Sequence, residues 1–443
     1  MEITKMILVF IGFIMFFLLL NKLEKSETLN SELIRKILHI GSGFGGLALP
    51  FIFEKKSSVM ILGVIFLAVL ISIRLIKNRI SGFRKVLETK NRKTFGDIYF
   101  IISILGLWIV SSEDKIMYSL PLIILMFSDA FAALIGEFYS KYKFDTGFGT
   151  KSVEGSVTFF LTTYFICINF FLFFSNIKSI NIVLVSLLLS ILAMILEMIS
   201  WNGLDNIFVP LFVYLFLKLN LYLTARELMY KLWVIVMLLI IIILNRKKTT
   251  LTKVAQTASL FFLYIVMIIG GIKWVVPPLI MYLGYYHFTP KVKGQVRDSL
   301  KGLLAIAFTT SMWLALSIVM DKNKMFLIYI FSFSLFFGII NLIRDNAGNI
   351  YRKTFRMNFL MESICKAAVF FLVNYFILSR ILDFKMLTGI AVLLFGGIFI
   401  YETSMKIFYI FEKENELSGE SKVFLTSGIV FACSMLLLGI GML

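Results

Sequence analysis

Long apolar stretches of about twenty residues follow one another from one end of the chain to the other. A helix of that length spans the hydrocarbon core of a bilayer, and the sequence holds roughly sixteen such candidates, some of them short or interrupted. Of the 443 residues, 59% are hydrophobic and 16% are charged, whereas a soluble domain is nearer half apolar and a quarter charged. We therefore predict an all-α polytopic membrane protein.

Basic residues in the connections predict how these helices are oriented. Connections rich in Lys and Arg alternate with short connections that carry few of them. Because Lys and Arg prefer the cytoplasmic side, this alternation places both termini outside and the basic connections in the cytoplasm. The net charge of +18 then attracts anionic lipid headgroups, so nucleic acid is not an expected partner. We expect a cell membrane protein whose chemistry faces the cytoplasm.

The basic connection Arg246-Lys247-Lys248 is the predicted boundary between two halves, residues 1–248 and 249–443. In the second half, Glu362 and Lys366 have the i,i+4 spacing of a structural ion pair. The second half also has acidic residues at helix ends, in an order similar to that of the first half. A degenerate duplication, in which the second half arose as a parallel copy of the first, would produce this order.

Ionisable side chains that interrupt apolar stretches are candidates for chemistry, because a charge in hydrocarbon is costly and is usually retained for a function. Asp129, Ala132, Ala133 and Gly136 are spaced to share one helical face. Small residues on that face let another helix or a ligand approach closely, but packing alone needs no acid. We therefore predict that Asp129 is functional.

Near the start of the second apolar stretch, Arg35 and His39 are four residues apart and share a helical face, with Lys36 beside Arg35. Without other evidence, this pattern is as typical of a basic helix end whose side chains reach toward the headgroups as it is of a functional site.

The connection from Lys141 to Ser156 combines glycines, a lysine and the start of another helix. A flexible glycine loop, Lys151 and the free N–H groups of a helix N-terminus together predict a phosphate site. The connection is not a Walker A loop, because Thr150 stands where that motif needs glycine. Glu154 is either functional or a favourable negative charge at a helix N-terminus.

Glu197 and Asp205 lie on either side of a helix break that Asn202-Gly203 signals, so that they can face each other across it. Carboxylates with a neighbouring amide suit Mg²⁺, which one or two protein carboxylates hold together with substrate phosphates. The sequence therefore predicts a nucleotide site. The metal ligands expected there are Asp129, Glu154, Glu197 and Asp205.

Between about Glu32 and Pro210 the chain resembles the polyprenol kinase family, the CTP-using membrane kinases that include dolichol kinase, phytol kinase and CTP-dependent diacylglycerol kinase. The elements that carry the resemblance occur in family order: Arg35-Lys36 with His39, Lys93 to Gly96, Asp129 with Ala132 and Gly136, Lys151-Ser152 with Glu154-Gly155-Ser156, and Glu197 with Asp205-Asn206 and Pro210. One departure is Glu137 to Ser140, which replaces the arginine motif usual after the glycine of the family.

The resemblance implies transfer of the γ-phosphoryl group of CTP, or of another nucleoside triphosphate, to the hydroxyl of a prenol or diacylglycerol. It implies a Mg²⁺ cofactor, phosphate binding by Lys151 and catalysis by the acids, one of which accepts the hydroxyl proton; which acid does so is left open. The residues implied to line the nucleotide site are Arg35, Lys36, His39, Gly136, Ser152, Gly155, Ser156 and Asn206.

Two other functions are compatible with the same pattern. A CTP:phosphatidate cytidylyltransferase also joins CTP to a membrane lipid, although its C-terminal acidic signature is not visible here. A lipid transporter or flippase would equally suit intramembrane acids and many helices. Nucleotide binding would separate the enzymes from the transporter, and the product would separate the two enzymes.

Overall fold

The computed structural model describes residues 1–25, 30–75, 95–111, 114–146, 149–245, 251–288, 300–347, 357–378, 384–411 and 419–439. These ranges contain sixteen α-helices and one short β-hairpin. Ten of these helices have at least 18 residues and are apolar enough to cross a membrane. The all-α polytopic fold is thereby confirmed, and the chain is a multi-pass membrane protein.

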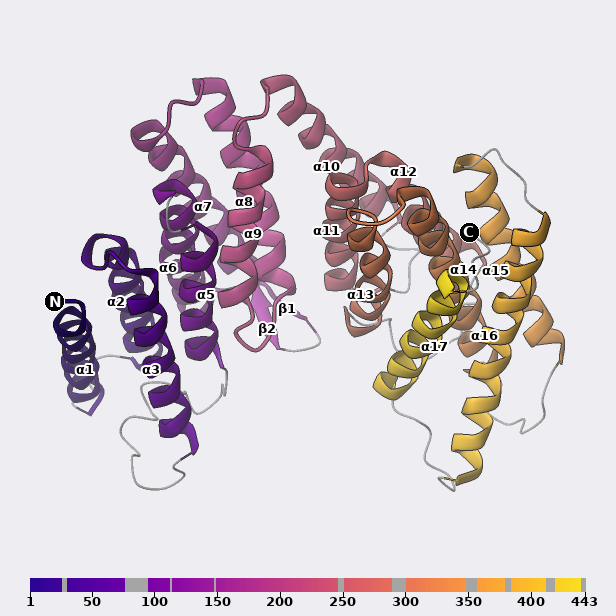
Figure 1. Ribbon diagram of the computed structural model, residues 1–443, viewed down its shortest axis with the longest axis horizontal. Coiled ribbons are helices and arrows are strands. Elements are labelled where there is room, and N and C mark those ends of the chain that lie inside the picture. The colour runs from indigo at the N-terminus through magenta and orange to yellow at the C-terminus, as the bar shows by residue number, and fades with distance from the viewer. Residues whose placement is uncertain are drawn as a thin grey trace. The chain divides into compact units, whose positions relative to one another are not determined.

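The described chain divides into two compact units, Met1–Trp233 and Val234–Leu443 (Figure 1). The division falls within helix α10, Ala225–Asn245. The boundary expected from the sequence, Arg246–Lys248, follows directly after this helix and lies outside the described residues.

The first unit contains α1 (Glu2–Lys25), α2 (Ser31–Ile52), α3 (Lys56–Leu75), α5 (Gly96–Ser111), α6 (Lys115–Phe138), α7 (Val153–Phe174), α8 (Ser179–Ile199), α9 (Asp205–Asn220) and the start of α10. Local signals set several of these helix ends. Asn30, Asp114 and Ser152 are the N-cap residues of α2, α6 and α7, and their side chains accept hydrogen bonds from N–H groups of the first turn. Between α8 and α9, Asn202 and Gly203 have φ of 52° and 84°, as the predicted turn requires.

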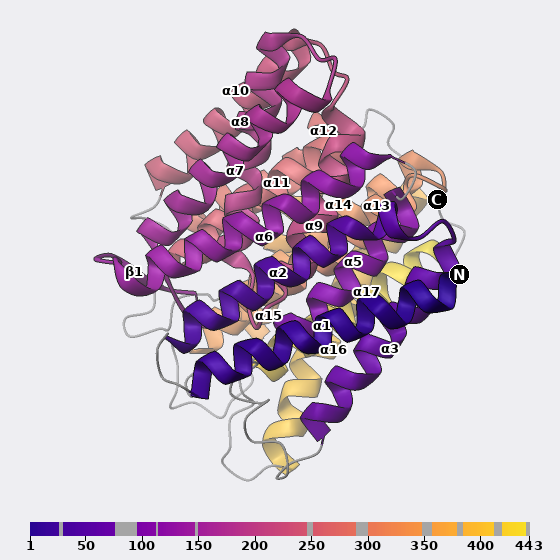
Figure 2. The same cartoon turned by 90° about the vertical axis from the view of Figure 1, so that its left-hand side faces the viewer.

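Five helices of this unit form a closed ring. Helix α1 packs on α2 and α3, α2 packs on α6, α6 packs on α5, and α5 packs on α3. Figure 2 shows α1, α2 and α3 along one face of the unit. On the other side of the ring, α9 packs on α5, α6 and α8, and α7 lies against α6 and α8. The ring encloses the space described below as a cavity.

The connection between α6 and α7 is a β-hairpin of strands β1 (Lys143–Asp145) and β2 (Thr150–Ser152), paired antiparallel with Phe144 opposite Lys151. The sequence predicted a flexible glycine loop here, and the described part of this connection is instead ordered by ladder hydrogen bonds. Gly147 and Phe148 of that predicted loop lie outside the described residues.

The second unit contains the rest of α10 with α11 (Lys253–Gly270), α12 (Ile272–Phe288), α13 (Leu300–Leu316), α14 (Lys322–Ala347), α15 (Met357–Leu378), α16 (Phe384–Phe411) and α17 (Gly419–Gly439). Helix α14 lies at its centre, packed against α12, α13, α15, α16 and α17. Its middle part is largely buried and mostly apolar, with Ser332, Ser334 and Asn341 as buried polar residues. On α15, Lys366 Nζ is 2.7 Å from Glu362 Oε1, which confirms the predicted ion pair.

Candidate functional site

A buried ion pair joins α2 to α6. Lys36 Nζ lies 2.6 Å from Asp129 Oδ2 and 3.3 Å from the backbone oxygen of Asp129. The side chains of Lys36 and Asp129 are only 3% and 16% exposed. Lys36 is therefore not a basic residue that reaches toward the headgroups. It neutralises a carboxylate that would otherwise stand uncompensated in a site of low dielectric constant.

His39 completes this group from the next turn of α2. Its Nε2 atom is 3.6 Å from Asp129 Oδ2 and within hydrogen-bond distance, 3.1 Å, of the backbone oxygen of Leu125. Arg35, on the same face of α2 as His39, pairs with Glu32 through two contacts of 2.5 and 3.1 Å. Arg35 is also close enough to Asp129 to be attracted by its charge.

Helices α6 and α7 cross at the small-residue stripe that the sequence singles out. A Cβ atom added at Gly155 would lie 2.9 Å from the backbone oxygen of Ala132, and one added at Gly136 would lie 2.9 Å from Ser152 Oγ. Both distances are too short for a real side chain. The stripe therefore receives another helix, α7, and places Gly136, Ser152 and Gly155 inside that contact.

Backbone N–H groups at the start of α7 already donate hydrogen bonds to other groups of the protein. The N–H group of Gly155 donates to Ser152 Oγ over 3.1 Å, and the N–H group of Val153 donates to the backbone oxygen of Tyr142 over 2.9 Å. The buried Ser156 hydroxyl donates to the backbone oxygen of Ser152. The free N–H groups that the sequence predicted here for phosphate binding are thus already paired at Val153 and Gly155.

Glu154 stabilises the connection between α6 and α7. One of its carboxylate oxygens accepts hydrogen bonds from the N–H groups of Lys141 and Tyr142, over 3.0 and 3.2 Å. These contacts hold the beginning of the α6–α7 connection against the start of α7. The described hydrogen bonds of Glu154 do not link it to Asp129, Glu197 or Asp205.

The hairpin brings Lys151 to the end of α8. Lys151 Nζ is 2.6 Å from Glu197 Oε1 and also donates to the backbone oxygen of Glu197. Both side chains are largely buried. Glu197 is close enough to Asp205 and to Asp129 for their negative charges to repel it. The sequence predicted that Glu197 and Asp205 face each other across the helix break, and their mutual repulsion is compatible with that prediction.

The break between α8 and α9 is packed against the start of α5. A Cβ atom added at Gly203 would lie 2.7 Å from the Cα atom of Gly96, so the two backbones are in direct contact. Asn206 Nδ2 donates to the backbone oxygen of Gly96 over 2.8 Å. Asn206 Oδ1 is buried and accepts no hydrogen bond from any described residue. Lys93 and Thr94, which precede this contact in the predicted element, lie outside the described residues.

The four acids do not form a single metal centre in the part of the chain that the structure describes, where no three His, Cys, Asp or Glu side chains are grouped closely enough. Asp129 and Glu197 are each held by a lysine, and Glu154 by backbone N–H groups. Asp205 and the unsatisfied amide oxygen of Asn206 are hard oxygen donors. They fit an ion that arrives with its own phosphate ligands, as Mg²⁺ commonly does.

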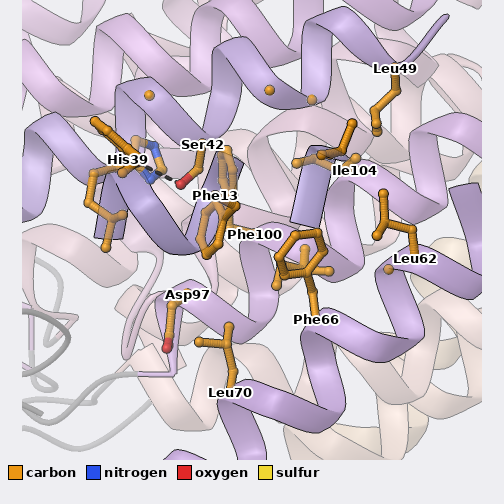
Figure 3. A pocket seen from close by; sticks show the side chains of 18 of the residues that line it. Phe13, His39, Ser42, Leu49, Leu62, Phe66, Leu70, Asp97, Phe100 and Ile104 are labelled. Carbon is orange, nitrogen blue, oxygen red and sulfur yellow. Dashed lines mark hydrogen bonds between the residues drawn. The ribbon is translucent and has the colours of Figure 1, made fainter. Parts of the chain in front are cut away.

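An apolar cavity of about 390 Å³ lies inside the helix ring, between α1, α2, α3 and α5. Figure 3 shows His39, Ser42 and Asp97 toward one end of it and Leu49, Leu62 and Ile104 toward the other. Asp97 is held by Arg74 of α3, whose Nη2 atom lies 2.5 Å from Asp97 Oδ1.

Sequence reasoning missed this cavity and the Arg74–Asp97 pair. The available signal for the cavity was the four glycines among residues 41–46, which are unusual within an apolar helix, and three of them line the cavity.

Comparison with known proteins gives one informative likeness. Neither a family model nor a solved structure matches the chain. Phytol kinase of Synechocystis sp. (strain ATCC 27184 / PCC 6803 / Kazusa) is 26% identical to it over 201 residues, which cover 44% of this chain and 80% of that kinase. This likeness supports a relationship at the level of prenol- and phytol-kinase-like proteins.

Proposed function

We propose that this protein is a lipid kinase, which transfers the γ-phosphoryl group of CTP or another nucleoside triphosphate to the hydroxyl of a prenol or diacylglycerol at the cytoplasmic membrane face. One observation carries the proposal. A buried carboxylate, Asp129, is held by Lys36, and His39, whose Nε2 atom lies 3.6 Å from that carboxylate, lines an apolar cavity inside the membrane domain. An acid beside a lipid-sized cavity is what phosphorylation of a membrane alcohol needs. The likeness to phytol kinase points the same way.

The site has two sides, to which we assign the two substrates. The cavity side, with His39 and Asp129, takes the lipid alcohol. The hairpin side, with Lys151, takes the nucleotide, whose phosphate oxygens replace Glu197 as partners of the lysine. Asp205 and Asn206 would hold a Mg²⁺ ion that arrives with the nucleotide and neutralises charge on its phosphates.

The transfer then proceeds as a single displacement. The hydroxyl oxygen of the lipid attacks the γ-phosphorus, and the bond from that phosphorus to the β–γ bridging oxygen breaks. The hydroxyl proton passes to the Asp129 carboxylate, and the nucleoside diphosphate leaves with the electron pair of the broken bond. Such a reaction depends on positioning and charge neutralisation more than on covalent help from the protein.

The test is to incubate the purified full-length chain with γ-labelled CTP, other nucleoside triphosphates, Mg²⁺ and a panel of prenols and diacylglycerols. We expect labelled lipid monophosphate. In a parallel reaction with phosphatidate and CTP, a cytidylyltransferase would instead release pyrophosphate and form a CDP-lipid, and a transporter would form neither product.

Asp129→Asn should lower turnover by at least about a hundredfold, the low end for a general base. Glu362→Gln is the matched control, because Glu362 is an exposed acid on a helix of the second unit. Wild-type turnover by the Asn variant would remove Asp129 from the chemistry.

A further inference from the structure

A second cavity of the first unit lies at the membrane face opposite the candidate site. Its volume is about 670 Å³, and its lining comes from the start of α6, the end of α7, the start of α8 and the connections that join α7 to α8 and α9 to α10. Figure 1 shows these two connections at the other end of the helices from the β-hairpin. Helix α8 begins at this cavity and ends beside Glu197, and its 21 residues span about 31 Å. The two sites are therefore separated by the thickness of the membrane.

Part of the lining of this second cavity is apolar and exposed. Phe174, Ile180 and Tyr222 are 66%, 56% and 82% exposed, and each lies at a helix end or just beyond one. Helices α7 and α8 are long and apolar enough to cross a membrane, so their ends lie at the level of the lipid headgroups, where tyrosine side chains are common. The cavity is therefore placed to receive a molecule that reaches it from the bilayer.

A positive charge in this lining has no partner in the protein. Lys178 is exposed and forms no ion pair with any described residue. The described acids closest in sequence to the lining are already engaged. Asp114 accepts hydrogen bonds from two N–H groups in the first turn of α6, and Glu227 accepts from the N–H group and the hydroxyl of Thr224. The lining therefore favours an anion, which Lys178 can bind.

Asn181 adds the need for a hydrogen-bond donor. Its Nδ2 atom donates to the backbone oxygen of Leu223 over 2.9 Å and so joins α8 to the connection between α9 and α10. Its Oδ1 atom is buried and accepts no hydrogen bond from any described residue. A buried acceptor without a donor is destabilising, so this atom calls for a partner that donates to it. A simple anion brings only further acceptors. A ligand that satisfies both residues carries an O–H or N–H group in addition to its negative charge.

We propose that this second cavity binds the headgroup of an anionic phospholipid that also carries hydroxyl groups, as phosphatidylglycerol does, in the leaflet opposite the candidate site. The phosphate lies beside Lys178, a headgroup hydroxyl donates to Asn181 Oδ1, and the first carbons of the acyl chains contact Phe174 and Ile180. The bound lipid links the α7–α8 connection to the α9–α10 connection. The inference does not depend on the proposed kinase function, because none of these residues belongs to the candidate site.

The experiment uses the full-length chain in nanodiscs of phosphatidylcholine with a small share of phosphatidylglycerol that carries a photoreactive group near the start of one acyl chain. Peptides labelled in the wild type should include residues 174–181 or 221–225. Lys178→Gln should lower this labelling about ten- to a hundredfold, the loss of one hydrogen bond to a charged group. Lys218→Gln is the matched control, because Lys218 is an exposed lysine in the last turn of α9 that does not line the cavity. It should lower labelling no more than about fivefold, as expected from the loss of one basic residue near a lipid surface.

A second comparison tests the role of the headgroup hydroxyl. Phosphatidylmethanol has the same charge as phosphatidylglycerol but no hydroxyl in its headgroup. As an unlabelled competitor it should displace the photoreactive lipid from the wild type about fivefold less well than phosphatidylglycerol does, which corresponds to the loss of one hydrogen bond. Asn181→Leu should remove this difference between the two competitors.

Four results would overturn the proposal in whole or in part. Equal losses of labelling in Lys178→Gln and Lys218→Gln would show that only the general charge of this face attracts the lipid. Wild-type labelling that avoids residues 174–181 and 221–225 would exclude the site without any variant, so a variant that fails to fold does not protect the proposal. Displacement of the lipid by millimolar inorganic phosphate would show that the cavity takes a free anion. Equal competition by phosphatidylmethanol in the wild type would remove the hydroxyl from the proposal.

Discussion

Replacing Lys36 with methionine should destabilise the membrane domain, because it leaves Asp129 without its buried partner. At 2.6 Å and an effective dielectric constant of about 20, the gross attraction of the two charges is about 6 kcal/mol. Desolvation offsets much of this, and removal of one partner of a buried pair typically costs about 3–5 kcal/mol. We expect Lys36→Met to lower the free energy of unfolding by about 3 kcal/mol.

The double variant Lys36→Met/Asp129→Asn removes both charges and should recover most of that loss, to within about 1 kcal/mol of the wild type. Unfolding would be followed by circular dichroism in mixed micelles titrated with denaturing detergent, and a double-mutant cycle would isolate the pair energy. The matched cycle is Glu362→Gln with Lys366→Met, where Glu362 is 51% exposed and a coupling of no more than about 0.5 kcal/mol is expected.

The reasoning fails if the cycle at Lys36 and Asp129 gives a coupling no larger than that of the exposed pair. The double variant also separates structure from chemistry. If it is folded and inactive, Lys36 or Asp129 acts in the reaction, and the single variant Asp129→Asn shows which; if it is folded and active, the pair only holds α6 to α2.

Three further predictions follow from the site and the two units. Lys151→Ala should raise the KM for nucleotide about tenfold, the loss of one charge-assisted hydrogen bond, and leave the KM for the lipid unchanged; an unaltered nucleotide dependence would place the phosphates elsewhere. Gly155→Leu should lower the thermal midpoint by forcing α7 away from Ala132, whereas Gly428→Leu should not, because a Cβ atom added at Gly428 of α17 would have nothing within 4 Å; equal midpoints would refute the close crossing. A fragment of residues 1–248 contains all of the first unit and should insert and bind nucleotide, and a well-inserted fragment that binds none would show that the site needs the second unit.

The membrane architecture could be predicted because the bilayer imposes a local rule. Any helix that spans it needs a long apolar stretch, whatever its neighbours are. The stripe of Ala132 and Gly136 likewise predicted that another helix or a ligand comes close to α6, because small residues leave room for it. The stripe did not identify Gly155 as its partner, because the sequence of one helix does not show which other helix packs against it.

Contacts between residues that are far apart in the sequence could not be predicted from local patterns. Lys36 and Asp129 are 93 residues apart, so their pairing follows from the packing of α2 on α6 and from no local pattern. The strands of the hairpin have three residues each, too short for an alternating pattern to stand out. The cavity depends on the packing of α1, α2, α3 and α5 against one another, which no local pattern shows.

Helices α5 and α9 have 16 residues each, and their first turns meet through Gly96, Gly203 and Asn206. At 1.5 Å per residue each is about 24 Å long, roughly 6 Å less than the hydrocarbon thickness of an ordinary bilayer. A helix shorter than the hydrocarbon core is accommodated by local thinning of the bilayer, by flanking side chains that reach the interface or by packing on longer helices, at a cost of a fraction of a kcal/mol per Å. We expect the bilayer to thin where α5 and α9 begin, near Asp205 and Asn206. In a thinned region a lipid alcohol can reach a water-soluble phosphate donor without leaving its leaflet, so turnover should fall as the host bilayer is made thicker.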